Sequence, residues 1–345
     1  MNSLIARRRL LLGTAAAAAG VGLGGTRARA AEPLRVGFVY LGPVGDFGWT
    51  YQHDQGRKAL ETALGSAIKT TGVENVTEGP DAERVVRQLA SNGNGLIFTT
   101  SFGFMNPTER VARQFPKVKF EQATGYKTLP NLAEYNARFY EGRAVCGTIA
   151  GHVSKSGIAG YVASVPIPEV VMGMDAFTLA AQKVNPNFKT KVIWVNSWFD
   201  PGKEADAAKS LIDQGADVLC QHTDSPAVMQ TAEERHVLAF GQASNMQSFG
   251  PSAQLTAIVN NWGPYYIERT KAVLDGTWKT QSVWLGMKQG IVQIAPYGPG
   301  VTPAAHDAAD KVKAGIIDGT FNPFAGPIKD QKGQQKIAAG AAIPD

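Results

Sequence analysis

The sequence predicts an α/β protein of two doubly wound parallel-sheet lobes, and three features of the chain support this fold class. Short apolar runs rich in Val, Ile and Phe alternate with helical patterns. The runs are almost continuously apolar, as expected of parallel strands that helices cover on both faces. About 315 residues remain once a leader-like segment is set aside, which is more than one ordinary core accommodates.

The first lobe is predicted from a run of strands and helices that ends near residue 122. The helix at 81–91 places Val85, Val86 and Leu89 on one face, which is the spacing of an amphipathic helix. The remaining segments follow the same alternation of apolar runs and helical patterns. The strands are expected at 34–40, 66–71, 96–100 and 117–122, and the other helices at 51–64 and 107–115.

The alternation restarts at residue 132 and predicts a second lobe of the same kind. Asn185-Pro186 ends one helix, and Pro201 with Gly215 brackets the next one. The expected strands are 132–136, 158–163, 191–196, 216–221 and 237–240, and the helices 141–154, 169–184, 201–214 and 226–235. A strand at 255–260, a helix at 264–274, a strand at 291–295 and a tail helix from 302 complete the chain.

Residues 1–30 are expected to be an export signal that is removed. Three arginines precede leucines and an apolar run too short for a membrane span, and Ala28-Arg29-Ala30 offers the small-x-small cleavage pattern. The arginines favour the twin-arginine route, with an ordinary Sec signal as the alternative. No cysteine lies at the cleavage point, so we expect a periplasmic protein without a lipid anchor.

The net charge of the chain gives no reason to expect nucleic acid as a partner. The sequence has 34 basic and 29 acidic residues, but five of the arginines lie in the predicted signal, which has no acidic residue. The excess therefore disappears on cleavage. The two cysteines, Cys146 and Cys220, are expected to be separate core thiols, with a disulfide as the alternative in an oxidising compartment.

No motif of the chain points to an enzyme, a cofactor or a metal. The sequence lacks a nucleophile elbow, a zinc-protease helix, a Walker loop and a Rossmann fingerprint. The five histidines have no metal-ligand spacing. We therefore expect a binding protein that has no cofactor and is not an enzyme.

The loops after the predicted strands are the candidate binding site, because ligands of open parallel sheets bind at the carboxyl ends of the strands. These loops are rich in aromatic, Asp, Asn and Gln side chains. Aromatic rings can stack on a planar heterocycle, while carboxylates and amides can read its edge. The candidate ligand-binding residues are Asp46, Phe47, Trp49, Phe102, Phe104, Trp198, Asp224, Gln242, Asn245 and Asn260.

Several stretches resemble the basic membrane protein (BMP) family of solute-binding proteins, whose type member is a purine nucleoside receptor. The similar stretches begin with RVGFV at 35–39, GDFGW at 45–49 and LIFTTSFGF at 96–104. They continue with YEGRAVCGTIAG at 140–151, KSGIAGYVA at 155–163, VNPN at 184–187, WFDP at 198–201 and QGADV at 214–218. All of them occur in the family's order.

The resemblance implies a type I periplasmic binding fold whose lobes are joined by a three-strand hinge and close on the ligand. It also implies delivery of a purine nucleoside or related molecule to an ABC transporter permease in the inner membrane. We assign residues 31–127 and 258–285 to the amino-terminal lobe and residues 128–257 and 286–345 to the carboxy-terminal lobe, with the cleft between them. A monomer is expected, since the lobes must move.

The chain departs from the nucleoside-binding members of the family in two stretches. Those members carry Asp in a Gly-x-Asp-x-Asp stretch, where residues 241–245 read GQASN and place Ala243 and Asn245 at the Asp positions, and they carry a Lys where this chain has Asn260. Such charged groups suit ribose hydroxyls. We therefore expect a free purine base such as adenine or guanine, or a related heterocycle. The alternatives are a nucleoside, a sugar or signal molecule on the same fold, or a sensor role in place of transport.

Overall fold

The computed structural model describes residues 32–45 and 47–343, which form two lobes within the compact unit from Pro33 onward. The predicted export signal at 1–30 and the candidate Asp46 lie outside the described residues. None of the helices in the described part is both long and apolar enough to cross a bilayer.

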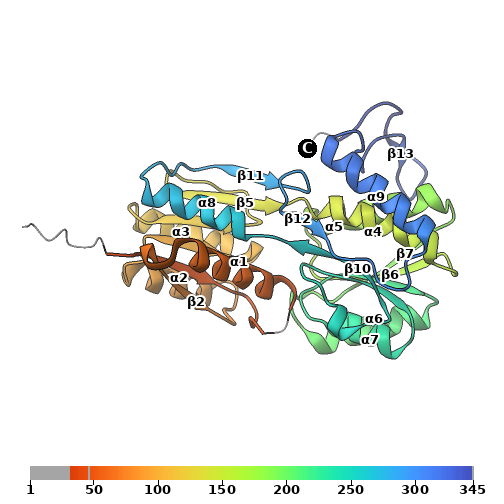
Figure 1. The fold of residues 1–345 in the computed structure, drawn as a ribbon, viewed down its shortest axis with the longest axis horizontal. Coiled ribbons are helices and arrows are strands. Elements are labelled where there is room, and N and C mark those ends of the chain that lie inside the picture. The colour runs from red at the N-terminus through yellow and green to blue at the C-terminus, as the bar shows by residue number, and fades with distance from the viewer. Residues whose placement is uncertain (1–31, 46, 344–345) are drawn as a thin grey trace, which may run out of the picture. The chain divides into compact units, whose positions relative to one another are not determined.

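The first lobe is a parallel sheet in the order β11-β5-β4-β3-β1-β2 (Figure 1). Its strands are β1 (Leu34–Val39), β2 (Ile68–Val73), β3 (Leu96–Thr99), β4 (Lys119–Ala123), β5 (Leu132–Ala137) and β11 (Ser282–Leu285). Its helices are α1 (Gly48–Leu64), α2 (Pro80–Ser91), α3 (Met105–Gln114) and α8 (Gly263–Leu274), with 3-10 turns η1 (Gly65–Ala67) and η2 (Phe102–Phe104).

Alternate residues of these strands enter different cores, which is why the strands read as continuous apolar runs. Phe38 and Phe98 pack with α1 and α8 on one face of the sheet. Their neighbours Val39 and Ile97 pack with α2 and α3 on the other face. The helices therefore cover both faces, as predicted.

The second lobe repeats this plan in the order β12-β10-β9-β8-β6-β7. Its strands are β6 (Ile158–Ala163), β7 (Lys189–Trp194), β8 (Val218–His222), β9 (Leu238–Gly241), β10 (Gln254–Asn260) and β12 (Val292–Ile294). Its helices are α4 (Phe139–Val153), α5 (Pro168–Val184), α6 (Pro201–Asp213), α7 (Ala227–Glu234) and α9 (Pro303–Asp318), with the 3-10 turn η3 (Gln247–Phe249). Figure 1 shows α6 and α7 on one side of this sheet and α4, α5 and α9 on the other.

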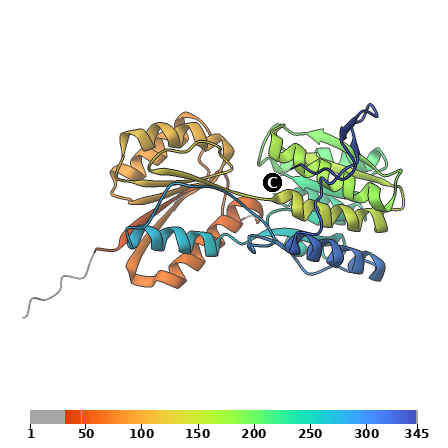
Figure 2. The same cartoon turned by 90° about the horizontal axis from the view of Figure 1, so that it is seen from above.

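Three connections pass between the two sheets of the described chain, as the family resemblance implied. They run from β5 into α4, from β10 into α8 and from β11 into β12. The three can be followed in Figure 2. Because all three lie near one another at the ends of neighbouring strands, the lobes can rotate about them as a hinge.

Two of the predicted lobe boundaries are misplaced. β5 was assigned to the carboxy-terminal lobe, yet it pairs with β4 and β11 in the first sheet. Most of β10 was assigned correctly, but its end after residue 257 stays in the second sheet, where it pairs with β12. The crossings therefore fall near Arg138 and Asn261. An apolar run shows that a strand exists but not which sheet it joins, since its partners are distant in sequence.

A buried ion pair fastens α8 to the first sheet. The Glu121 carboxylate on β4 is fully buried and accepts hydrogen bonds from Arg269 Nε (2.5 Å), the Tyr265 hydroxyl (2.7 Å) and Trp278 Nε1 (2.7 Å). Burial raises the pKa of Glu121, and the Arg269 guanidinium opposes that rise. The two cysteines, Cys146 on α4 and Cys220 on β8, are separate buried thiols, as predicted.

Candidate functional site

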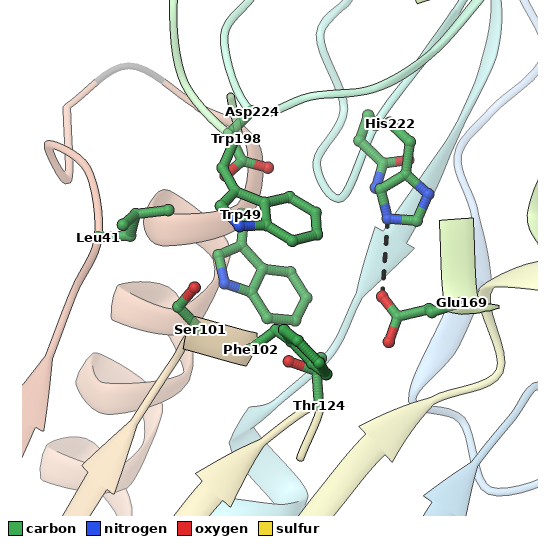
Figure 3. A pocket seen from close by; sticks show the side chains of 10 residues that line it. Leu41, Trp49, Ser101, Phe102, Thr124, Glu169, Trp198, His222 and Asp224 are labelled. Atoms are coloured by element: carbon green, nitrogen blue, oxygen red, sulfur yellow. Dashed lines mark ion pairs between the residues drawn. The ribbon is translucent and has the colours of Figure 1, made fainter. Parts of the chain in front are cut away.

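A cavity lies where the carboxyl ends of strands from both sheets face each other. Each lobe contributes five of its lining residues. They are Leu41, Trp49, Ser101, Phe102 and Thr124 from the first lobe, and Glu169, Trp198, His222, Asp224 and Gln242 from the second. Figure 3 shows Trp49, Trp198 and Phe102 on one side of this cavity and His222 with Glu169 on the other.

The aromatic wall is held rigidly by contacts behind it. Trp49 lies in the first turn of α1, and its Nε1 donates a 2.5 Å hydrogen bond to the carbonyl oxygen of Thr100, which follows β3. Its ring meets those of His53 and Trp262 edge-on, at centroid distances of 4.2 and 5.6 Å. Because its one donor is already used, Trp49 offers a ligand only its apolar surface.

Asp224 supplies a carboxylate that has no side-chain hydrogen-bond partner among the described residues, although only 8% of its surface is exposed. Burial raises the pKa of Asp224 well above its usual value, and Glu204, Glu78 and Glu169 raise it further by repulsion. A ligand that donates hydrogen bonds to Asp224 would favour its charged form and would offset the cost of burying the carboxylate.

Two other carboxylates position the loops that carry the lining residues. Glu78 accepts hydrogen bonds from Gly103 N (3.0 Å) and Ser101 Oγ (2.5 Å), which fixes the loop of Phe102. Glu204 accepts from Asp200 N (3.0 Å) and Ser225 Oγ (2.7 Å), which fixes the loops of Trp198 and Asp224. No sequence pattern singled out either glutamate, because each acts on a loop that is distant in sequence.

His222 and Glu169 form the opposite side of the cavity. The Glu169 carboxylate accepts a 2.8 Å hydrogen bond from Asn136 Nδ2 and lies 3.7 Å from His222 Nε2. Burial lowers the pKa of His222, and Arg143 lowers it further, while Glu169 opposes the shift. His222 is therefore a neutral imidazole at neutral pH. Among the described residues, no group of three or more His, Cys, Asp or Glu could hold a metal ion.

The two lobes touch each other beside the cavity at Gly48. Its backbone N donates a 2.7 Å hydrogen bond to Ser244 Oγ of the second lobe. A Cβ atom at this position would lie 2.0 Å from the Asp224 carbonyl oxygen, and φ is +83°. Both the close approach and the positive φ require glycine here.

The structure gathers five of the predicted site residues around the cavity, namely Trp49, Phe102, Trp198, Asp224 and Gln242. Sequence reasoning did not propose five others as ligand residues. Each of the five lies at or soon after the carboxyl end of a strand: Leu41 after β1, Ser101 after β3, Thr124 after β4, Glu169 in the first turn of α5 after β6, and His222 as the last residue of β8.

The structure places four of the predicted residues away from the cavity lining. Phe104 is fully buried in the core of the first lobe, because the 3-10 turn η2 points Phe102 and Phe104 in different directions. Phe47 packs against Tyr51 and Phe249 at centroid distances of 4.5 and 5.2 Å. Asn245 accepts a hydrogen bond from Gln254 Nε2.

Asn260 is the fourth of these residues. Its side chain is fully buried, and both of its amide atoms lack a hydrogen-bond partner among the described residues. Its backbone N donates to the Ala243 carbonyl oxygen at 2.9 Å, so positions 243 and 260 are neighbours at the end of the sheet. Neither position brings a charged group to the cavity.

Comparison with known proteins agrees with this architecture. A purine-binding protein of Brucella abortus (strain 2308) is 60% identical over 330 residues, which are 96% of this chain and 94% of that protein. A candidate ABC transporter glucose-binding protein of Haloferax volcanii is 36% identical, over 86% of this chain and 75% of its own length. The structure of an ABC transporter solute-binding protein from Aeropyrum pernix K1 has the same fold, with a TM-score of 0.71, 19% identity and coverage of 86% and 95% of the two chains.

The sequence pattern of the Bmp family, described as ABC transporter substrate-binding protein PnrA-like, matches residues 34–318. The description of this family is that of proteins that bind substrates for ABC transporters. The match covers both lobes and all three connections between them. The chain therefore belongs to the Bmp family of ABC transporter substrate-binding proteins.

Proposed function

We propose that this protein binds a free purine base, such as adenine or guanine, in the cleft and delivers it from the periplasm to an ABC transporter permease. The observation that carries the proposal is the small cavity with an aromatic wall and polar groups around it. Sites for small molecules are typically concave and lined by aromatic side chains with a few polar groups, as this cavity is. The name of the Brucella relative, purine-binding protein, supports the same ligand class.

The aromatic wall suits a flat ring system. Trp49, Phe102 and Trp198 line the cavity, and stacking of a base on one such ring contributes about 1–3 kcal/mol. A purine presents two apolar faces and a polar edge, so it can use this wall and still satisfy its ring atoms. A sugar has fewer apolar faces and many more hydroxyls.

The polar groups suit the edge of an amino-substituted base. The unpartnered Asp224 carboxylate can accept a hydrogen bond from an exocyclic amine or from a ring N–H. Such a bond to an ionised acceptor contributes about 1.5–3 kcal/mol. The residue would be ionised when the ligand donates to it, since a donor favours the charged form.

Among the described residues, positions 243 and 260 offer the ribose of a nucleoside no charged partner. At these positions, the resemblance to nucleoside-binding members would call for Asp and Lys. Here Ala243 is apolar, and Asn260 is fully buried and absent from the cavity lining. A ribose would add three hydroxyl groups to be satisfied in the cleft. We therefore expect the base to bind more tightly than its nucleoside.

Glucose is the second candidate, because a candidate glucose-binding protein is among the relatives and two carboxylates line the cavity. Asp224 and Glu169 could accept hydrogen bonds from sugar hydroxyls. The described residues of the cavity lining include no arginine, however, and sugar sites commonly surround hydroxyls with both Asp and Arg. The experiment below separates the two ligand classes.

Isothermal titration calorimetry with matched ligands tests the proposal. Ligand carried through purification is first removed by unfolding and refolding, and mass spectrometry identifies what is released. Adenine, adenosine, guanine, guanosine, ribose and glucose are then titrated. We expect a base to bind at least tenfold more tightly than its nucleoside, and no heat from ribose or glucose. Tight glucose binding without base binding would overturn the proposal.

A pair of tryptophan variants controls for the position of the ligand. Trp198→Ala removes a ring that lines the cavity, and we expect it to weaken base binding by about 5- to 150-fold, which corresponds to 1–3 kcal/mol. Trp194→Ala removes a ring of the same kind at the end of β7, outside the cavity. It is expected to leave the affinity within about twofold.

The periplasmic location rests on the export pattern of residues 1–30, and substrate-binding proteins of ABC transporters act outside the cytoplasm. Fractionation of cells that express the full chain tests it. We expect the mature protein in the periplasmic fraction, and replacement of Arg8 and Arg9 by Lys should retain the precursor in the cytoplasm if the twin-arginine route is used. Export of that variant at the normal rate would point to the Sec route.

A further inference from the structure

Arg143 is a fully buried cation on α4 that forms no ion pair with a carboxylate among the described residues. Burying a charge in this way is costly unless hydrogen bonds compensate it. The surrounding helix α4 is otherwise largely apolar and buried. The position therefore calls for a reason other than the stability of the lobe.

The guanidinium of Arg143 connects three neighbouring points at the ends of β8 and β9. Nη1 donates to Cys220 Sγ at 3.1 Å, and Nη2 donates to the Gln221 carbonyl oxygen at 2.6 Å. Nη2 also donates to Oε1 of Gln242, which lines the cavity. The guanidinium lies 5.4 Å from the centroid of the Tyr161 ring, which fixes its plane from one side.

Arg143 thus determines whether the oxygen or the nitrogen of the Gln242 side-chain amide can form a hydrogen bond with a ligand. An amide ordinarily offers a donor and an acceptor and can turn to suit its partner. Here the oxygen is engaged by the cation, while Nε2 has no hydrogen-bond partner among the described residues. Turning the amide would place its NH₂ group against the guanidinium, donor against donor, and would leave the buried cation without one of its acceptors.

We propose that Arg143 is a positioning residue that makes Gln242 a fixed hydrogen-bond donor, so that the cleft selects ligands with an acceptor at that edge. The inference rests on the proposed function and deepens it. For adenine the acceptors are the ring nitrogens N1, N3 and N7. The positive charge behind the amide also polarises it, which strengthens the donor.

In this arrangement a purine meets one hydrogen-bond donor and one hydrogen-bond acceptor of the protein. Gln242 donates to a ring nitrogen, whereas the Asp224 carboxylate accepts from an amine or a ring N–H. A base with a donor and an acceptor on its edges satisfies both groups. A ligand of the same size that lacks the acceptor leaves the Nε2 group unpaired inside the closed cleft, and such losses typically weaken binding by about 5- to 150-fold.

The test compares adenine with 1-deazaadenine, 3-deazaadenine and 7-deazaadenine by calorimetry on the full-length mature protein. Each analogue replaces one ring nitrogen by C–H at almost unchanged size. The measured quantity is the discrimination ratio, the Kd of the analogue divided by the Kd of adenine. We expect one analogue to show a ratio of about 10 or more in the wild-type protein.

Variants of Gln242 and Arg143 then show whether these two residues cause the discrimination. In Gln242→Met the ratio is expected to fall to about 1 for that analogue, with the other two ratios unchanged. In Arg143→Met the amide is free to turn, so the ratio is expected to fall below about 3. A merely structural role of Arg143 would change stability but would leave the discrimination ratio as it is.

Gln242→Glu provides a second measurement that does not require an Arg143 variant to fold. The carboxylate would pair with Arg143, so the melting temperature is expected to equal or exceed that of the wild type. The donor would be lost, and adenine binding should weaken at least tenfold. Gln247→Glu makes the same chemical change at an exposed position five residues along the chain, and we expect it to alter neither quantity.

Several results would overturn the inference. They are wild-type ratios below about 3 for all three analogues, an unchanged ratio in Gln242→Met or in folded Arg143→Met, or a strong loss of stability in Gln242→Glu. Wild-type protein that binds no purine base would overturn the proposed function, and the inference with it. Wild-type binding with unaltered ratios in the variants would overturn the inference alone.

Discussion

Gly48→Ala provides the sharpest test of the claim that ligand binding requires the lobes to touch as they do here. The added Cβ would lie 2.0 Å from the Asp224 carbonyl oxygen, whereas ordinary contacts begin at 3.4 Å. The lobes would therefore have to stay about 1.4 Å farther apart at this point. The Asp224 oxygen belongs to the backbone, so no side-chain rotation relieves the clash.

The size of the effect follows from the cost of overpacking, which is about 1–3 kcal/mol for one extra carbon in a tight contact. The apparent Kd is the intrinsic Kd divided by the closed fraction, so this cost should weaken base binding by about 5- to 150-fold. The strain of an alanine at φ +83° is present in both open and closed protein. It should lower the melting temperature slightly without adding to the loss of affinity.

Calorimetry measures the affinity for the base, and small-angle scattering measures how far the lobes close when the ligand is added. Gly48→Ala should lose affinity for the base, and it should show a smaller decrease in radius of gyration on ligand addition than the wild type. Gly45→Ala is the matched control, because a Cβ there meets no atom within 4 Å. Equal affinities of Gly48→Ala, Gly45→Ala and wild type would refute the idea that the Gly48–Asp224 contact belongs to the ligand-bound state.

Two further substitutions separate stability from binding. Asp224→Asn should stabilise the ligand-free protein at pH 7 by about 0.5–2 kcal/mol, because the carboxylate is buried and is repelled by Glu204, Glu78 and Glu169. The same substitution should weaken base binding at least tenfold, because the ligand loses a charged hydrogen-bond acceptor. Since the pKa of Asp224 is raised in the folded state, the gain should vanish below about pH 4 and grow as the pH rises, and urea unfolding across that range checks it. A gain that is constant with pH would contradict this origin. Glu121→Gln should cost about 3–5 kcal/mol in urea unfolding, because Arg269 loses its buried counter-charge, while the folded fraction keeps its affinity for the base. A loss under about 1 kcal/mol would show that the pair contributes little.

Much of the fold could be predicted because local signals mark the ends of its elements. Asn185-Pro186 ends α5 at Val184, and Pro201 begins α6 as the sequence indicated. The pairing of distant strands was not predictable in this way. β11 has only four residues and alternates between exposed and half-buried positions, so it lacks the apolar run that marks the other strands. The hairpin of β13 (Ile328–Lys329) and β14 (Gln335–Ile337) was missed for the same reason.

The site could be predicted as far as the rule of strand ends applies. That rule placed Trp49, Phe102 and Trp198 among the candidates, and the structure brings the three side chains together around one cavity. It could not tell which residues of a loop face the cavity, so Phe104 was included although it belongs to the core. Arg143 lies in a stretch that resembles the family, but its role was not predicted, because the function of a single cation in an apolar helix depends on partners that are distant in sequence.

The affinity of the ligand-free wild-type protein for adenine against adenosine tests the central claim most directly. Both ligands carry the same ring system, so the ratio of their Kd values reports how the cleft treats the ribose together with the loss of the N9–H donor that the ribose replaces. With Ala243 apolar and Asn260 buried outside the cavity lining, we predict that adenosine binds at least tenfold more weakly than adenine. Adenosine binding as tight as adenine or tighter would contradict the account, because it would show that other residues of the cleft hold the ribose.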